Sequence, residues 1–297
     1  MAATVNVNGR ISGEHEAVIP VFDHGFLYGE GIYETLRTYD GRLFLFDRHL
    51  RRLRNSARLI DLPLPFTDDE LAARIQETIA AANLPLAPRS GRPQEAYVRV
   101  LVTRGVGELT YDPKATPTPS SVIIVKPLSP PSAETYEKGV RVVLTGVVRN
   151  HPQSVNPMIK SNNLMNSALA AQEALKRGGF EAVMRNYRGE LTEGTQSNLF
   201  IVSNGSALTP PLACGLLPGI TREFLFEIGP EIGVEVREQV LRDDDLFAAN
   251  EAFLTSTTRE VLPIVAVDDR AIGAGRPGPI TLQLLDAFRA RICSGGL

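Results

Sequence analysis

The sequence predicts an α+β protein of two unequal domains. Strand-like and helix-like segments follow one another along the 297 residues, and 43% of the residues are hydrophobic, enough for large cores. Many of the 21 prolines fall in DPKATPTP and KPLSPPSAE, segments that resist both helices and central strands. We therefore expect a small α/β domain over residues 1–126, an interdomain linker over 127–136 and a larger domain over 137–297.

Two hairpins are predicted in the first third of the chain. Asn8-Gly9 separates the segments VNV and RIS, and Asp40-Gly41 separates GIYETLRTY from RLFLF. Asparagine, aspartate and glycine accept the positive φ angles of a type I′ turn, which joins two strands directly. Further strands are expected over residues 95–103, 120–126, 139–148, 181–186, 198–203, 207–210, 234–240 and 251–257.

Helices are predicted from spacing and from their first residues. Asp47 is expected to cap a helix over residues 47–60, in which apolar residues recur at helical spacing. Thr67, followed three residues later by Glu70, predicts a capping box for a second helix. Further helices are expected over residues 162–179, 220–229 and 243–249.

Composition excludes several classes of protein. The net charge is −3 without a block of lysine and arginine, so nucleic acid is not expected as the main partner. No apolar run approaches the roughly 18–20 residues of a membrane helix, and the N-terminus does not resemble a secretory signal. Two separated cysteines and four scattered histidines predict neither a disulfide framework nor a metal site. We therefore expect a cytoplasmic protein.

Lys160 is the first candidate for chemistry. It ends the apolar stretch PMIK, and Ser161-Asn162-Asn163 follow as the expected start of a helix. Side chains at such a junction between strand and helix project into clefts. Partial burial would lower the pKa of the amine and allow it to form a Schiff base. The alternative is a solvated lysine.

Other polar residues are further candidates for a site. Glu193 lies in GELTEGTQSNLF, where its carboxylate would keep a heterocyclic nitrogen protonated; the alternative is a glutamate of a solvated turn. In LLPGITREFLFEIG, the free N–H groups of a helix start and the Thr221 hydroxyl would bind an anion, unless they serve only as a cap. Ser256, Thr257 and Thr258 offer hydroxyls at a strand end. Arg52 would bind a phosphate or belong to a solvated basic face.

Together these segments resemble the class IV (fold type IV) pyridoxal-phosphate aminotransferases. The matching segments are YGEGIYETLR, FDRHLRRLRNSA, IKSNNLMNSALAAQEA, GELTEGTQSNLF, LLPGITRE and EAFLTSTTREVLPI, and they span nearly the whole chain. The resemblance implies pyridoxal 5′-phosphate as cofactor, a smaller N-terminal α/β lobe and a larger cofactor-binding lobe with a barrel-like mixed sheet. It also implies a homodimer or higher homo-oligomer, in which a loop around Gly105–Tyr111 completes the partner's site.

Residue roles follow from the same resemblance. Lys160 matches the catalytic lysine that holds the cofactor, Glu193 the carboxylate facing the pyridine nitrogen, and Arg52 the phosphate-binding arginine. Further cofactor contacts are expected from Leu217, Ile220, Thr221, Ser256 and Thr257. Substrate contacts are expected from Tyr28, Tyr33, Tyr97, Arg99 and Thr258.

The resemblance implies transamination with small-molecule amino donors and keto acids. An amino donor would displace Lys160 from its aldimine, and the freed amine would take the Cα proton. A ketimine would then form and release a keto acid by hydrolysis, which gives ping-pong kinetics.

The substrate is expected from subgroup features. YGEGIYE and AYVRV are similar to segments of branched-chain amino-acid aminotransferases, which implies branched-chain L-amino acids as donors and 2-oxoglutarate as acceptor. Leu164 replaces a tyrosine that is usual in that subgroup, and KSNNLMN is closer to D-amino-acid transaminases. Leu109 and Tyr111 stand where typical D-amino-acid enzymes have arginine and histidine.

Several alternatives stay open. Within the fold they are a D-amino-acid transaminase, an (R)-amine transaminase and 4-amino-4-deoxychorismate lyase. Thr35 in the segment YETLR resembles the residue found there in the lyase and in some (R)-amine transaminases. Arg104 competes with Arg99 for the substrate carboxylate. Outside enzymes, a non-catalytic binding protein would have no need of Lys160 and Glu193.

Overall fold

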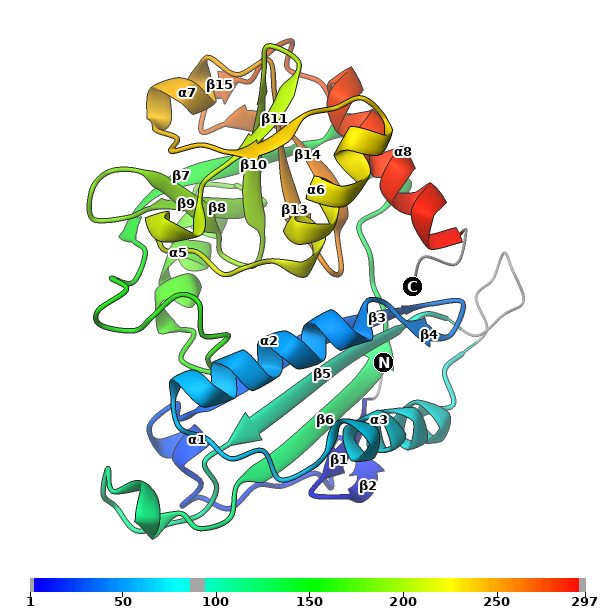
Figure 1. The fold of residues 1–297 in the computed structure, drawn as a ribbon, viewed down its shortest axis with the longest axis vertical. Helices are drawn as coiled ribbons and strands as arrows, with labels where there is room; N and C mark the ends of the chain where they lie inside the picture. The colour runs from blue at the N-terminus through cyan, green and yellow to red at the C-terminus, as the bar shows by residue number, and fades with distance from the viewer. Residues whose placement is uncertain (1–2, 86–93, 294–297) are drawn as a thin grey trace. The chain divides into compact units, whose positions relative to one another are not determined.

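The computed structural model describes residues 3–85 and 94–293, which form two units, each built around a β-sheet (Figure 1). The N-terminal unit comprises the described residues up to Ser129 together with Ile159–Asn163. The C-terminal unit comprises Pro130–Met158 and the described residues from Leu164 onward. Both units contain helices and strands, so the predicted α+β class is confirmed.

The N-terminal unit contains an antiparallel six-stranded sheet. Its strands are β1 (Thr4–Val7), β2 (Arg10–Gly13), β3 (Gly31–Tyr39), β4 (Arg42–Leu43), β5 (Ala96–Thr103) and β6 (Ser120–Pro127). Its helices are α1 (His24–Leu27), α2 (Phe46–Leu59), α3 (Asp68–Ala82) and the 3₁₀ turn η1 (Pro113–Ala115). The strand order is β2-β1-β6-β5-β3-β4. Both predicted hairpins are present, with positive φ at Asn8-Gly9 and Asp40-Gly41.

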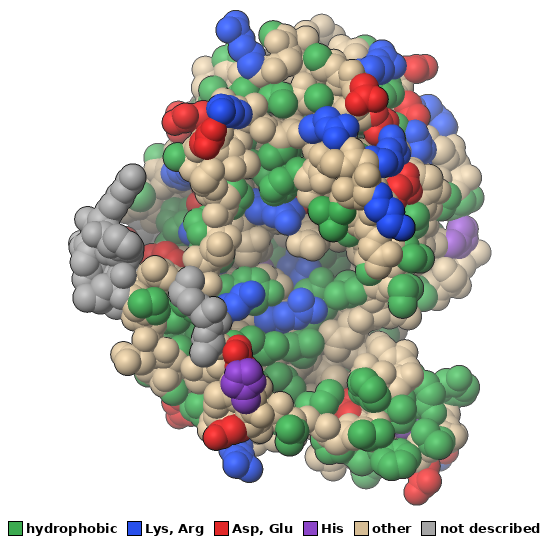
Figure 2. Space-filling model, turned by 180° about the vertical axis from the view of Figure 1, so that it is seen from behind, with side chains coloured by type: hydrophobic (Ala, Val, Ile, Leu, Met, Phe, Trp, Pro, Cys, Tyr) green, Lys and Arg blue, Asp and Glu red, His purple; other side chains and the backbone are tan. Residues whose placement is uncertain are grey.

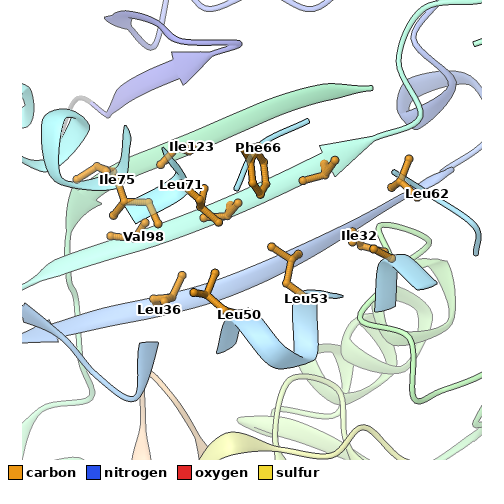
Figure 3. Packing of buried hydrophobic residues seen from close by; sticks show 14 of the residues in the cluster. Ile32, Leu36, Leu50, Leu53, Leu62, Phe66, Leu71, Ile75, Val98 and Ile123 are labelled. Atoms are coloured by element: carbon orange, nitrogen blue, oxygen red, sulfur yellow. The ribbon is translucent and has the colours of Figure 1, made fainter. Parts of the chain in front are cut away.

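One face of this sheet packs against α2 and α3. Ile32 and Leu36 of β3 face Leu50 and Leu53 of α2 in a buried cluster that also includes Ile75 of α3 (Figure 3). Successive side chains of a strand point to opposite faces. The odd-numbered residues of β3 therefore lie on the other face of the sheet.

The two long helices begin in different ways. Thr67 and Glu70 form the predicted capping box of α3. The predicted cap of α2 by Asp47 is wrong, because the chain turns into this helix through Leu45, whose φ of 46° is left-handed. Leu45 is the N-cap without a side-chain hydrogen bond, and Asp47 lies in the first turn, where its charge still favours the helix.

The C-terminal unit contains a mixed nine-stranded sheet and the remaining described helices. Its strands are β7 (Val140–Val148), β8 (Glu181–Arg185), β9 (Leu191–Gly194), β10 (Asn198–Ser203), β11 (Ser206–Thr209), β12 (Val236–Glu238), β13 (Glu251–Ser256), β14 (Glu260–Val267) and β15 (Arg270–Ala271). Its helices are α4 (Ala133–Lys138), α5 (Met165–Lys176), η2 (Leu212–Cys214), α6 (Ile220–Glu231), α7 (Asp243–Phe247) and α8 (Pro279–Cys293).

Six of these strands close into a ring. The sheet runs β12-β11-β10-β13-β14-β7-β8-β9, with β15 on β14. A further pairing, between Asn198 of β10 and Glu193 of β9, joins the end of this path back to β10. Strand pairs β7–β8 and β7–β14 are parallel, whereas β10–β13 is antiparallel. The predicted barrel-like mixed sheet is therefore confirmed.

The segment that carries Lys160 differs from the prediction. Among the described residues β7 ends at Val148, so no strand leads into Lys160, and α5 begins at Met165 rather than at Ser161-Asn162-Asn163. The reason lies in the hydrogen bonds of this segment. Its backbone bonds to β3 instead of to a helix of its own, and Ser161 forms an isolated bridge with Ile32.

Within residues 3–85 and 94–293, no helix combines the length and the apolar character required to cross a membrane.

Three buried ionisable side chains interrupt the apolar layer between β3 and α2. Glu34 follows Ile32 and precedes Leu36 on the core-facing side of β3, and His49 and Arg52 lie on α2. Arg52 donates from Nε to Glu34 Oε1 (2.7 Å) and from Nη2 to Oε2 (2.8 Å). His49 Nδ1 lies 2.7 Å from Oε2 of the same carboxylate.

The pKa values of this cluster follow from burial and charge. Burial by itself would raise the pKa of the Glu34 carboxyl, but Arg52, followed by His49, holds that pKa well below its usual range. Burial lowers the pKa of His49, against the effect of Glu34, and the charges of Arg52 and Lys160 lower it further. Because the Glu34 carboxylate has no proton to donate, the neutral His49 carries its proton on Nδ1.

Acidification is expected to destabilise the N-terminal unit through His49. Its ordinary pKa is 6.5 and its folded pKa is lower, so below about pH 6.5 the unfolded chain binds a proton that the folded chain does not. The stabilising contribution is complete above the ordinary value and is lost as the pH falls through the folded value. We expect the free energy of unfolding in urea to fall between pH 7.5 and pH 5.

The matched variant is His49→Asn, which keeps a donor near Nδ1 and does not titrate, so its stability should depend less on pH than that of the wild type. His15→Asn is the control, because His15 is fully on the surface and the change should preserve the wild-type pH dependence. Identical pH profiles for wild type and His49→Asn would show this prediction to be wrong.

Candidate functional site

The backbone of Lys160 is attached to the first residues of β3 and to α2. The Tyr33 N–H donates to the carbonyl of Lys160 (2.9 Å), and the Lys160 N–H donates to the Ser56 hydroxyl (3.1 Å). The Asn162 N–H donates to the carbonyl of Gly31 (2.9 Å). A Cβ on Gly31 would collide with the Asn162 side chain and a carbonyl of β5, so this close approach requires glycine. The lysine is thus placed by residues of its own unit.

The side chains of Lys160 and Arg99 meet at the ring of Tyr33. Lys160 Nζ lies 4.6 Å from the ring centroid, and Arg99 Cζ lies 4.1 Å from it. Cations at these distances are attracted by the electron-rich face of the ring. The Tyr33 ring is therefore in contact with both an amine and a guanidinium. Arg99 lies on the face of the sheet opposite to α2.

The other predicted substrate residues of this unit lie in two places. Tyr97 is two residues from Arg99 on β5, hence on the same face, and its ring lies 5.0 Å from Lys126 Nζ. Tyr28 precedes β3, and its ring packs against His24 and against Tyr111, with centroids 4.8 Å and 5.1 Å away. Tyr33, Tyr97 and Arg99 are thus brought to one face, and Tyr28 joins the segment of Tyr111.

Arg104 is engaged by backbone carbonyls. Its Nη2 donates to the carbonyl of Ile60 (2.6 Å), its Nη1 to that of Asp61 (3.3 Å), and its Nε lies 3.6 Å from a carboxylate oxygen of Glu30. The guanidinium is buried in these contacts. Arg99 is therefore the better candidate for binding a substrate carboxylate.

In the C-terminal unit, Glu193 is buried, and its carboxylate accepts hydrogen bonds from an arginine, a backbone N–H and a side-chain amide. Arg149 Nε donates to Oε1 (2.8 Å), and Oε2 accepts from the Leu217 N–H (3.0 Å) and from Asn198 Nδ2 (3.3 Å). The same Asn198 amide donates to the carbonyl of Leu217 (3.0 Å). Charge-assisted hydrogen bonds stabilise the ionised form of a carboxyl group. The fold thus presents an oriented anion beside Leu217.

The start of α6 is the predicted anion site of this unit. Gly219 is the N-cap, Ile220 is the first helical residue, and the cap has no side-chain hydrogen bond. The hydroxyl of Thr221 is buried and has no hydrogen-bond partner among the described residues. Unsatisfied N–H groups at the start of a twelve-residue helix, with a buried hydroxyl beside them, suit an anion such as phosphate.

The predicted hydroxyls at residues 256–258 lie at the end of β13 and in the following turn. The Ser256 hydroxyl is buried and, within the described chain, has no partner. Arg259, next in the turn, donates to the buried carboxylate of Glu181. Glu181 also accepts from the Gln196 N–H (2.7 Å) and the Ser197 hydroxyl (2.9 Å). This carboxylate therefore ties the turn of Ser256–Arg259 to the loop that follows Glu193.

Sequence reasoning missed several residues, both beside Arg52 in the N-terminal unit and around Glu193 in the C-terminal unit. Glu34 had a readable signal: it stands in phase with Ile32 and Leu36, so its carboxylate must be buried and must have a partner. His49, which was not predicted, lies on the inner face of α2 beside Leu50 and three residues before Arg52, which was predicted. Arg149, Asn198 and Glu181 had no comparable signal, because their partners are distant in the sequence.

Comparisons with known proteins identify the family. The chain matches the amino-transferase class IV family over residues 31–267. A Methanocaldococcus jannaschii protein provisionally named a branched-chain-amino-acid aminotransferase is 37% identical over 96% of this chain and 95% of its own length. The D-alanine aminotransferase of Bacillus licheniformis is 31% identical over 97% of this chain and 96% of its own length.

Solved structures agree. The Escherichia coli branched-chain amino acid aminotransferase superposes with a TM-score of 0.90 at 31% identity, covering 98% of this chain and 94% of that one. The branched-chain amino acid aminotransferase of Thermobaculum terrenum, in its PLP-bound holo form, has a TM-score of 0.83 at 29% identity over 98% of this chain and 94% of that one.

The side chains present fit pyridoxal phosphate. With the cofactor bound, Lys160 would offer an amine for the aldehyde, and Glu193 would offer a carboxylate for a protonated pyridine nitrogen. Within residues 3–85 and 94–293, the hydroxyls of Thr221 and Ser256 are buried without a partner, and with the helix start at Ile220 they would offer donors for the phosphate. The chain is therefore a pyridoxal-phosphate-dependent enzyme that belongs to the class IV aminotransferases.

Proposed function

We propose that this enzyme transfers the amino group of branched-chain L-amino acids to 2-oxoglutarate with ping-pong kinetics. The observation that carries the proposal is the group of Lys160, Tyr33 and Arg99, in which an amine and a guanidinium share one aromatic ring. An α-amino acid has a reacting Cα next to a carboxylate, and these two side chains match that pair. The names of several relatives support branched-chain substrates.

The roles of the cofactor-binding residues are part of the proposal. Pyridoxal phosphate, when bound, supplies an electron-withdrawing ring that stabilises negative charge at the substrate Cα. Lys160 holds the cofactor covalently and, once released, moves the Cα proton on its Nζ. Glu193 keeps the pyridine nitrogen protonated, and Leu217 packs against the ring. The phosphate donors are Arg52, the Ile220 N–H and the hydroxyls of Thr221, Ser256 and Thr257.

The substrate residues complete the assignment. Arg99 binds the substrate carboxylate by paired donors, because Arg104 is engaged by carbonyls. Tyr28, Tyr33 and Tyr97 supply aromatic surface for an aliphatic side chain, and Thr258 supplies a hydroxyl. D-amino-acid transamination is the second candidate, favoured by the 31–32% identity to D-alanine aminotransferases.

We also propose a homo-oligomer that uses the apolar surface of residues 17–28 and 105–111. The Gly107 N–H donates to the carbonyl of Phe22 (3.2 Å), so the two segments lie together. Several large apolar side chains are exposed there: Val18, Val21, Phe22, Phe26, Val106, Leu109 and Tyr111. Figure 2 shows hydrophobic side chains gathered at the lower right, over the part of this unit that bears α1. Apolar patches of this kind mark protein interfaces.

Lys160→Ala is expected to lower kcat for transamination by at least about 10³-fold, because both the covalent attachment and the proton transfer are lost. Borohydride reduction of the holoenzyme followed by mass spectrometry should place the cofactor on Lys160 in the wild type and on no residue in the variant. Lys176→Ala, on the exposed side of α5, is the control and should keep wild-type activity. Near-normal turnover by Lys160→Ala would refute the assignment.

A donor panel tests the substrate class. With 2-oxoglutarate as acceptor, we expect kcat/KM to be highest for L-leucine and L-valine, and lower for D-alanine, D-glutamate and (R)-1-phenylethylamine. A preference for D-alanine would replace the proposal by the second candidate.

In the same panel, Arg99→Gln should reduce the preference for leucine over leucinamide about tenfold or more, because only leucine has the carboxylate.

Sedimentation tests the oligomer. The wild type should sediment as a dimer or larger species, and Phe22→Ser with Phe26→Ser should shift the protein toward monomers while leaving the helix content unchanged. Leu175→Ser, an exposed leucine on α5, should leave the oligomeric state unchanged. A wild-type monomer at micromolar concentration would contradict this part of the proposal.

A further inference from the structure

We propose that Glu34 and His49 are positioning residues for Arg52, and that they set its guanidinium in the orientation in which it binds the phosphate group of the cofactor. The inference rests on the proposed role of Arg52 and extends it to two side chains that need not touch the cofactor. It is carried by the hydrogen-bond geometry of the cluster and by its place within an apolar core.

The geometry fixes the plane of the guanidinium. Arg52 uses Nε and Nη2 on the two oxygens of one carboxylate, at 2.7 Å and 2.8 Å. Two parallel hydrogen bonds from a planar group to a planar group leave little freedom of rotation. A long arginine side chain would otherwise occupy many rotamers.

His49 in turn fixes the carboxylate. Its Nδ1 lies 2.7 Å from Glu34 Oε2, the same oxygen that accepts from Arg52 Nη2. His49 and Arg52 are three residues apart on α2, so they lie on one face of the helix. One strand and one helix thus hold all three groups in a single arrangement.

Stability alone does not account for the cluster. The surrounding layer consists of Ile32, Leu36, Leu50 and Leu53, all buried. Replacing a buried ion pair by apolar side chains of similar volume is often neutral or stabilising, because the desolvation of two charges is costly. A bidentate pair kept at this place is better explained by the orientation that it imposes.

The charge of the cluster suits an anion. Glu34 and Arg52 offset each other, His49 is neutral near pH 7, and the charge of Lys160 acts on His49 from the same unit. His49 Nε2 is buried without a hydrogen-bond partner among the described residues, which agrees with a ring held for its Nδ1–H rather than for two hydrogen bonds.

The test compares two ligands that differ only in the phosphate. Apoenzyme is titrated with pyridoxal phosphate and with pyridoxal, and the ratio of the two dissociation constants measures what the phosphate contributes. Arg52→Gln defines the ratio expected when the arginine is lost. We expect Glu34→Gln to reduce the ratio about tenfold or more, with little change in the affinity for pyridoxal.

Two variants of His49, one with asparagine and one with leucine, keep the proposal testable if Glu34→Gln does not fold. Asparagine can place its amide nitrogen near the position of Nδ1, whereas leucine removes the donor at similar volume. His49→Leu should reduce the ratio severalfold, and His49→Asn should restore it to within about threefold of the wild type. Thermal unfolding of each apoenzyme shows whether a variant is folded.

Three results would overturn the proposal. An unchanged ratio in the folded variants would show that neither residue positions Arg52. Equal weakening of both ligands would show a general packing role. Tighter binding of pyridoxal phosphate by Glu34→Gln would show that Glu34 competes with the phosphate for Arg52. If the wild type binds pyridoxal phosphate without a covalent bond to Lys160, the proposed function itself fails, and the wild-type titration and labelling reveal that separately.

Discussion

The ion pair between Glu34 and Arg52 is the constraint on which the N-terminal part of the candidate site depends. Both charges lie between a sheet and a helix, where neither is stable without the other. The pair fixes the position of α2 against β3. On the same helix, the Ser56 hydroxyl accepts a hydrogen bond from the N–H of Lys160. The position of the amine therefore depends on the helix that carries the arginine.

Successive side chains of β3 point to opposite faces of the sheet, so neighbouring residues of this strand contact different groups. Glu34 faces α2 and joins the phosphate-binding candidate Arg52, while Tyr33 takes part in the contacts with Lys160 and Arg99. A shift of one residue in the pairing of β3 with β5 would exchange these faces. The antiparallel register of the sheet thus determines which residues of β3 lie on the side of Arg52 and which lie on the side of Arg99.

Local signals predicted most of the fold, and distant partners account for what was missed. The hairpin at Asn8-Gly9 and the capping box of Thr67 depend on neighbours within a few residues, so the sequence was sufficient. The roles of Lys160 and Glu193 were predicted from the resemblance to a family, and they stay predictions. By contrast, the left-handed Leu45, the backbone pairing of Ser161 with Ile32 and the closure of β9 onto β10 depend on contacts that no local pattern contains.

Each of the two units holds a buried carboxylate, Glu34 or Glu193, and the donors come from different elements in the two cases. Each must keep an ionised carboxylate oriented inside a largely apolar core, which is costly unless every oxygen is hydrogen-bonded. In the N-terminal unit, Glu34 is held by side chains of one helix, so a single element supplies both donors. In the C-terminal unit, Glu193 is held by an arginine after β7, an amide of β10 and a backbone N–H before α6. The second carboxylate is therefore oriented only when the closed sheet has formed, which makes its chemistry a property of the complete unit.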